Sequence, residues 1–224
     1  MGRSGASPTP EASDERYWHM GIPTPSVRKL ARKSSERFGS LAWPERVETV
    51  YSLLAYGSDE AAHLAVFLLG RTIGSVDRVD EKALTHMVGL LRGWSVTDAF
   101  CIEVLQPLLE RFPSEVLSMT ACWSTEESRW KRRASVVLFT RKVGASGRYT
   151  EVGLSACERL IHDADDLVRK GVGWALKDLM RGERDPVLAY VADLRRRGIP
   201  SVITLYALRD VRGDDRRRVL AIKP

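Results

Sequence analysis

The chain has 224 residues, of which 44% are hydrophobic and 29% charged, and its formal net charge is +6. This composition is ordinary for a soluble globular protein with a sizeable core, and the basic excess leaves a polyanionic partner open. No apolar run approaches the ~18 residues of a membrane span, no signal-peptide core is present, and the cysteines and histidines lack zinc-ligand spacing. We therefore expect a cytoplasmic protein that binds neither a membrane nor a metal.

The N-terminal segment differs from the rest of the chain. Residues 1–14 are rich in Gly, Ser, Pro and Thr and carry few apolar groups, so burial cannot offset the entropy of ordering them. We predict a flexible tail there and a single folded domain over residues 15–224. Residues 15–19 are expected to form the first ordered turn, and residues 21–25 (GIPTP) then break the chain. Ser26 is predicted to cap a basic helix over residues 27–33.

From residue 44 onward one amphipathic segment follows another. The stripe Val47, Val50, Tyr51 and Leu54 has the i, i+3, i+4, i+7 spacing of a helix face. The spacing of apolar residues predicts helices over residues 44–54, 59–70, 81–91, 94–111, 114–123, 126–142, 149–161, 165–180, 186–196 and 200–209. The turns between them are short and carry Gly, Pro or Asp, and no alternating strand pattern intervenes.

This pattern predicts an all-α protein of stacked antiparallel helix pairs, an α-α superhelix or solenoid with HEAT-like repeats. The sequence contains no crisp repeat, so the period depends on the spacing of the elements alone. A plain helix bundle would give much the same pattern from one sequence. In a solenoid, the concave face is the usual binding surface.

Trp94 and Asp98 lie four residues apart at the start of a predicted helix, so their side chains share a face. Two later segments could supply partners. Residues 130–134 (WKRRA) are basic, and residues 169–174 (RKGVGW) end in Trp174. Aromatic side chains, a carboxylate and an arginine together suit a flat or cationic ligand carried on a polyanion.

Each of these residues also has an ordinary structural explanation when it is taken singly. Asp98 could be a helix-start acid that interacts with the macrodipole and the free backbone N–H groups. Trp94 and Trp174 could pack in the core. The basic side chains of residues 129–133 could form a solvated face.

Four segments taken together resemble the DNA alkylation repair glycosylases of the AlkD type, which are built from HEAT-like repeats. Residues 21–29 are similar to that family's Gly-Ile/Val-x-x-Pro-x-x-Arg segment, and residues 94–98 to its Trp-x-x-x-Asp element. Residues 130–134 resemble its Trp-x-x-Arg-Ala element, and residues 169–176 its Lys-x-Ile/Val-Gly-Trp-x-Leu element. The four occur in order over nearly the whole predicted domain.

The resemblance implies a monofunctional DNA-alkylpurine glycosylase that needs no cofactor and has no lyase activity. Its partner would be double-stranded DNA containing N3- or N7-alkylated purines, and bulky adducts would be admitted because the family leaves the base exposed. The resemblance makes Asp98 the catalytic carboxylate, with Trp94 and Trp174 beside the damaged nucleotide and Arg133 near the phosphodiester.

Contacts to the DNA backbone are implied for Arg28 and Lys170, and we expect the basic residues Lys29, Arg129 and Arg132 to add to them. The family's upstream aromatic residue has no assigned counterpart, because residues 17 and 18 lie too close to the Gly-Ile segment. We expect a monomer associated with the nucleoid. Two other interpretations stay open: a helical-repeat DNA-binding protein without catalysis, and a protein-interaction scaffold whose charge is incidental.

Overall fold

The computed structural model describes residues 16–223; the tail predicted for residues 1–14 lies outside them. All regular elements of the described part are helical, which confirms the all-α prediction. The only extended pairing among these residues is an isolated bridge between Trp18 and Ser58. None of the described helices has the length and apolar character to cross a membrane.

The elements follow one another with short connections. In chain order they are α1 (Thr24–Gly39), α2 (Trp43–Ala55), α3 (Asp59–Thr72), η1 (Ile73–Ser75), α4 (Glu81–Gly89), α5 (Trp94–Phe100), η2 (Cys101–Leu105), α6 (Gln106–Arg111), α7 (Pro113–Trp123), α8 (Arg129–Val137), α9 (Arg141–Ala145), α10 (Thr150–Glu158), α11 (Asp166–Gly182), α12 (Arg184–Arg196), α13 (Ser201–Ala207) and α14 (Gly213–Ala221). Most of them match the helices predicted from apolar spacing to within a few residues.

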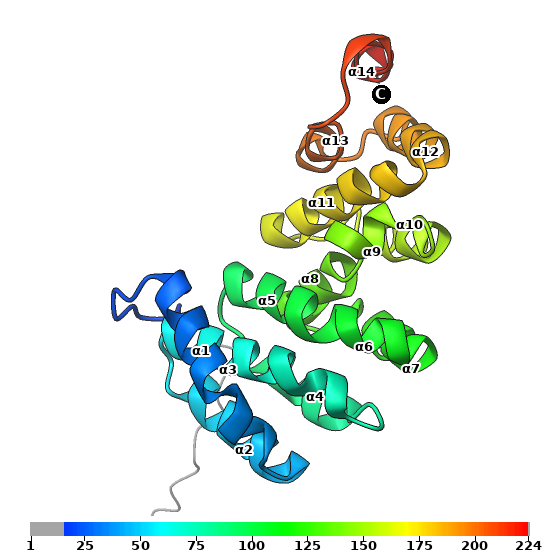
Figure 1. Cartoon of the computed structure of the whole chain (residues 1–224). Coiled ribbons are helices and arrows are strands. Elements are labelled where there is room, and N and C mark those ends of the chain that lie inside the picture. The colour runs from blue at the N-terminus through cyan, green and yellow to red at the C-terminus, as the bar shows by residue number, and fades with distance from the viewer. Residues whose placement is uncertain (1–15, 224) are drawn as a thin grey trace, which may run out of the picture.

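The helices stack into an elongated, solenoid-like pile (Figure 1). A continuous run of contacts leads from α3 to α5, α8, α11 and α13, and the remaining helices pack beside this run. The buried apolar side chains form one cluster that extends from Tyr17 to Val219. A single core therefore holds α5, α8 and α11 side by side, and these are the helices that carry the site described below.

The predicted helix over residues 126–142 is wrong in one respect, because the structure divides it into α8 and α9. Thr140 is extended (φ −100°, ψ 174°), and Arg141 has a φ of 55°. The buried carboxylate of Asp178 accepts the backbone N–H of Arg141 at 2.7 Å. The break therefore depends on Asp178 of α11, and no Gly or Pro in the sequence indicates it.

Three other expectations are corrected near the chain ends. Ser26 lies inside α1, which begins at Thr24 with proline in its first turn, so it is not the cap. Residues 16–19 are not a turn: the Trp18 N–H donates to Gly57 at 3.2 Å, and its carbonyl accepts the Asp59 N–H at 3.0 Å. Helix α14 was not predicted because its apolar pattern is too sparse; Val219 is its one buried residue.

The predicted helix over residues 94–111 is continuous but contains a π-helical turn, η2, between α5 and α6. Pro107 has no N–H, so the Glu103 carbonyl lacks its usual helical donor. Helix α3 packs closely here, because a Cβ on Gly70 would lie 2.7 Å from the Glu103 carbonyl oxygen. The turn thus separates α5, which carries Trp94 and Asp98, from α6.

Candidate active site

Asp98 of α5 and Arg133 of α8 form a buried ion pair. Arg133 Nε donates to Oδ1 and Nη2 to Oδ2, both at 2.8 Å, and the side chains are 10% and 6% exposed. This is the two-pronged geometry in which an arginine holds a carboxylate most firmly. The Nη1 group of Arg133 donates to the Leu167 carbonyl at the start of α11. One guanidinium thereby ties together α5, α8 and α11.

These contacts overturn the ordinary explanations for both residues. Helix α5 begins at Trp94 and has no acidic residue in its first turn, so Asp98 lies one turn further along. Its oxygens face Arg133 instead of free backbone N–H groups, and the macrodipole explanation is therefore wrong. Arg133 is buried, so it does not belong to a solvated face either.

The pKa of Asp98 reflects two opposing effects. Burial raises this pKa above its ordinary value, while the hydrogen bonds and charge of Arg133 and the charge of Arg141 oppose the rise. A buried carboxylate with a raised pKa and a specific cationic partner is typical of functional sites. The same balance shows that a second cation, Arg141, lies within electrostatic reach of the carboxylate.

Arg141 was missed by sequence analysis, and no motif marks it. Its guanidinium carbon lies 5.5 Å from the ring centroid of Trp174, over the indole. Among the described residues it is the one non-glycine with positive φ, a conformation that costs energy for an L-residue. The hydrogen bond from the Arg141 backbone N–H to Asp178 stabilises this conformation. The main chain thereby directs the Arg141 side chain toward Trp174.

The two predicted tryptophans have different surroundings. Trp94 is 56% exposed, so the explanation that it packs in the core is wrong. It stands at the first residue of α5, one turn before Asp98. Trp174 of α11 is half-buried and packs against the core. The structure therefore brings Asp98, Arg133, Arg141 and Trp174 together, with Trp94 as an exposed aromatic side chain beside them.

The glycines that flank Trp174 serve close packing. A Cβ on Gly171 would lie 3.4 Å from Arg133 Nη1, and one on Gly173 would lie 2.7 Å from Tyr206 Cβ. Gly171 leaves room for the Arg133 guanidinium, and Gly173 lets α13 approach α11. The segment over residues 169–174 thus places Trp174 and supports Arg133.

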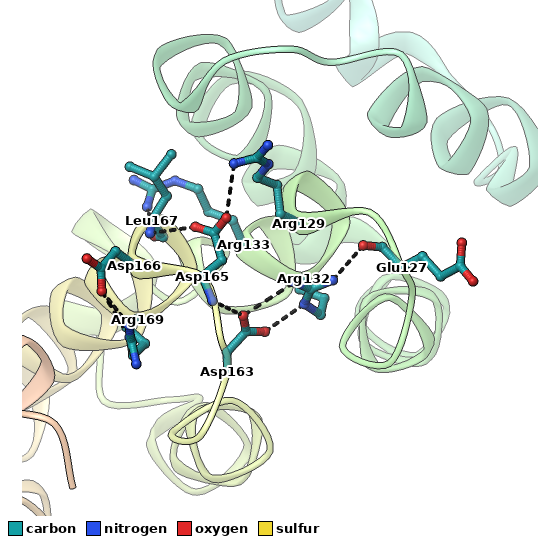
Figure 2. A network of polar contacts seen from close by, with 9 residues as sticks. All are labelled: Glu127, Arg129, Arg132, Arg133, Asp163, Asp165, Asp166, Leu167 and Arg169. Atoms are coloured by element: carbon teal, nitrogen blue, oxygen red, sulfur yellow. Dashed lines mark hydrogen bonds and ion pairs between the residues drawn. The ribbon is translucent and has the colours of Figure 1, made fainter. Parts of the chain in front are cut away.

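Two of the residues predicted to contact DNA form ion pairs within the protein (Figure 2). Arg129 pairs with Asp165 at 3.1 Å. Arg132 pairs with Asp163 at 2.6 Å and also donates to the Glu127 carbonyl at 2.6 Å. The acidic segment before α11 therefore neutralises part of the basic segment of α8. A contact of Arg129 or Arg132 with DNA stays a prediction, but the internal bonds of Arg132 favour a structural role for its side chain.

The other predicted DNA contacts lie on the surface. Lys29 and Lys170 are exposed. Arg28 is paired with Glu103 at 2.9 Å and lies 3.9 Å over the Phe67 ring centroid. Their role as DNA contacts also stays a prediction. The described residues contain no group of three or more His, Cys, Asp or Glu side chains that could hold a metal ion.

Comparison with known proteins adds a family to this geometry. The sequence profile of the family described as "DNA alkylation repair enzyme" matches residues 9–211. A predicted DNA alkylation repair enzyme from Enterococcus faecalis is similar in structure, with a TM-score of 0.74 and 14% identity over 87% of this chain and 89% of that one. No curated protein matches the sequence.

A second solved structure is an alkylpurine DNA glycosylase, AlkC of Pseudomonas fluorescens, bound to DNA containing an abasic-site analogue. It aligns with a TM-score of 0.59 and 18% identity over 82% of this chain and 51% of that chain. At these identities the two structures establish the fold alone.

Proposed function

The chain belongs to the DNA alkylation repair enzyme family, and from this premise we propose that it is a monofunctional DNA glycosylase of the AlkD type. Its substrate is duplex DNA containing N3- or N7-alkylated purines, and its helix pairs are HEAT-like repeats in one domain over residues 15–224. The observation that carries the proposal is the buried Asp98–Arg133 pair one turn from the exposed Trp94. The protein acts as a monomer in the cytoplasm, associated with the nucleoid.

The substrate explains why so few groups are needed. A purine alkylated at N3 or N7 is already positively charged, so it leaves as a neutral base without a general acid. Cleavage of the bond between its nitrogen and C1′ builds positive charge on the deoxyribose, as in glycoside hydrolysis. Water then supplies the oxygen that bonds to C1′ and loses a proton. No metal or organic cofactor enters this scheme.

Asp98 is the group that meets this developing charge. A carboxylate fixed near the sugar stabilises the oxocarbenium-like transition state and positions or deprotonates the attacking water. Arg133 bonds to both oxygens of Asp98 at 2.8 Å, so it holds the carboxylate ionised and oriented. Three of the five N–H groups of an arginine are then used, counting the bond to Leu167, and two remain for a phosphodiester.

The aromatic and basic side chains hold the nucleotide. The indole faces of Trp94 and Trp174 attract a cationic base more than a neutral one through the ring quadrupole. Arg28, Lys29 and Lys170 neutralise phosphates and supply affinity that does not depend on sequence. Trp94 is 56% exposed, which supports a mode of action in which the base stays outside the protein without flipping into it. This arrangement tolerates bulky adducts.

The experiment that tests the proposal measures the release of free base from methylated duplex DNA, with duplex binding measured in parallel. We expect the wild type to release N3- or N7-methylpurine and Asp98→Asn to lose about 100-fold or more in rate while still binding. Asp163→Asn is the matched control, because Asp163 is also a buried aspartate paired with an arginine of α8. An Asp98→Asn variant as active as this control would remove Asp98 from the mechanism.

A non-catalytic DNA-binding protein is the second candidate. The observation that favours it is that both oxygens of Asp98 are already bonded to Arg133. It predicts salt-sensitive duplex binding by wild type and Asp98→Asn alike, with no base release from either. The third interpretation, a scaffold, predicts no duplex binding at all.

A further inference from the structure

Exposed apolar side chains gather where the described chain begins. Trp18, Met20, Ile22 and Tyr56 are between 42% and 59% exposed, and we call these four residues the apolar edge. The Trp18 and Tyr56 rings lie 5.5 Å apart. A soluble protein gains nothing in folding from such exposure, and clustered apolar side chains at a surface mark a place of interaction.

The loop that displays Met20 and Ile22 is rigidly held. The carboxylate of Glu60, a buried residue of α3, accepts the backbone N–H groups of Met20, Gly21 and Ile22 at 3.0, 2.9 and 3.2 Å. Burial raises the pKa of Glu60, but these N–H donors outweigh it and hold the pKa below its ordinary value. A charged acceptor thus fixes the loop before any partner arrives, which lowers the entropy cost of binding.

The apolar edge is tied to the start of α5, the helix that carries Trp94 and Asp98. Tyr17 precedes it and packs against Gly93, where a Cβ would lie 3.4 Å from Tyr17 Cδ2. On the other side of Trp94, the Ser95 hydroxyl donates to Asp59 at 3.4 Å. The two chain neighbours of Trp94 are therefore anchored to Tyr17, which directly precedes the edge, and to Asp59, whose backbone N–H donates to the Trp18 carbonyl at 3.0 Å. These contacts place the edge beside the start of α5.

The charge beside the apolar edge selects the partner. The chain leads from Ile22 directly into α1, whose first turn has no acidic residue. The exposed basic residues of α1 are Arg28, Lys29, Arg32, Lys33 and Arg37. Glu36 is the one acidic residue in this helix. A partner with regularly spaced anions and apolar faces between them fits this surface, and the deoxyribose-phosphate backbone of DNA has that chemistry.

We propose that the apolar edge is a second DNA-contact surface, on which Met20 and Ile22 pack against deoxyribose faces of the duplex beside the lesion. Arg28 and Lys29 bind the adjoining phosphates, and Glu60 is the positioning residue of the loop. This inference rests on the proposed DNA binding but not on catalysis. It predicts a part of the affinity that salt does not screen.

The test compares duplex binding at several salt concentrations for wild type and the double variant Met20→Ser/Ile22→Ser. We expect Kd to rise about tenfold, from two half-exposed apolar side chains that no longer become buried. The slope of log Kd against log salt should stay unchanged, because no phosphate contact is lost. Leu205→Ser/Val152→Ser is the matched control, since both residues are exposed apolar side chains outside the apolar edge, on α13 and α10; it should bind like the wild type.

Each outcome decides the inference. A double variant that binds like the wild type, or one whose salt slope falls, shows that Met20 and Ile22 do not provide an apolar DNA contact. An equal loss of affinity in the control pair shows that serine at any exposed apolar position weakens binding, and this overturns the inference too. If the double variant unfolds at a lower temperature, the single variants Met20→Ser and Ile22→Ser decide in its place, by the same slope criterion.

Base release from methylated DNA, measured on the same preparations, separates this inference from the proposed function. A wild type that binds duplex without releasing base, together with a double variant of reduced affinity, supports the apolar DNA contact and overturns the glycosylase proposal. A wild type that releases base, together with a double variant of unchanged affinity, supports the glycosylase and overturns the apolar DNA contact. A wild type that binds no duplex overturns both, and the edge is then the contact surface of another kind of partner.

Discussion

Arg133 donates two hydrogen bonds of 2.8 Å to the carboxylate of Asp98, and both side chains are almost entirely buried. The carboxylate is therefore oriented and charge-compensated before any ligand arrives. Such preorganisation is the usual source of electrostatic stabilisation in active sites, because no solvent has to reorganise when charge develops. The pair also makes the ionisation of Asp98 depend on Arg133.

Removal of Arg133 should shift the pH dependence of base release. Burial raises the pKa of Asp98, and Arg133 opposes that rise. Because the ionised carboxylate is the active form, the rate falls as pH drops below this pKa. In Arg133→Gln the pKa rises further, so the acidic limb of the pH–rate profile moves to higher pH.

Profiles of wild type, Arg133→Gln and Arg132→Gln would check this shift, with Arg132→Gln as the control from the same helix. Breaking the buried pair also costs about 3–5 kcal/mol of stability, so assays should be run well below the melting temperature. A profile of Arg133→Gln with an unmoved acidic limb would contradict the role given to Arg133.

Arg141→Gly should increase stability while it decreases activity. The φ of 55° at Arg141 costs an L-residue about 1 kcal/mol that glycine does not incur. Base release should nevertheless fall, because the guanidinium over Trp174 is lost. Thermal melting and base release measured together test this. Lys142→Gly is the control, and we expect it to lower stability. A Tm of Arg141→Gly at or below the wild-type value would refute the strain argument.

Most of the helices could be predicted from sequence because their apolar residues lie three or four positions apart; α14, with one buried residue, is an exception. The divisions between them could not always be predicted. Thr140 and Arg141 look like ordinary helix interior, and the chain breaks there because Asp178, 37 residues away, accepts the Arg141 N–H. Arg141 itself carries no local signal, so its place beside Trp174 emerges only from the folded chain.

The sequence indicated Asp98, Arg133, Trp94 and Trp174 for the candidate site, but it did not indicate Arg141 or the contacts that join these residues. Resemblance to a family selected Asp98 and Arg133, and the structure adds their direct pairing. The same basic segment suggested that Arg132 meets DNA, but its guanidinium turns to Asp163, 31 residues later. Sequence charge shows which residues are basic; only packing decides which of them are already neutralised.

That distinction predicts different salt behaviour for two basic residues. Lys170 is exposed, so Lys170→Gln should reduce the slope of log Kd against log salt by about 0.9, the loss of one phosphate contact. Arg132 is bonded to Asp163 and to two backbone carbonyls, so Arg132→Gln should lower Tm and leave the slope unchanged. Binding titrations over a salt series and thermal melts would decide, and a reversed pattern would reassign the two residues.

Gly173→Ala should destabilise the protein beside Trp174. The added Cβ would lie 2.7 Å from Tyr206 Cβ and 2.9 Å from the Ile203 carbonyl oxygen, so α13 must move away from α11. We expect a loss of about 1–3 kcal/mol, as for overpacking in a core. Gly74→Ala is the matched control, because nothing lies within 4 Å of its Cβ position. Denaturant melts of both variants test this, and equal stability would count against close α11–α13 packing.

Glu60 should contribute stability that depends on pH. Its pKa is below the ordinary value in the folded protein, where the N–H groups of Met20, Gly21 and Ile22 bond to it. The stabilisation is present above the unfolded-state pKa of about 4.3, and it is lost as pH falls through the folded-state pKa. Glu60→Gln should therefore have a lower Tm than wild type at pH 7 and approach it in acid. A Tm difference that is constant with pH would show that the charge of Glu60 does not hold the loop.

The π-helical turn at Cys101–Leu105 is relevant to the direction in which the Asp98 side chain points. An i→i+5 turn takes one residue more than an α-helical turn, and one residue rotates a helix by about 100°. The extra residue is therefore taken up within the turn, and Asp98 and Leu108 keep the faces that they would have on an unbroken α-helix. One residue added to α5 itself, outside this turn, would instead rotate Asp98 by about 100° away from Arg133. The direction of the carboxylate therefore depends on where along the helix a residue is gained, and not only on which residues are present.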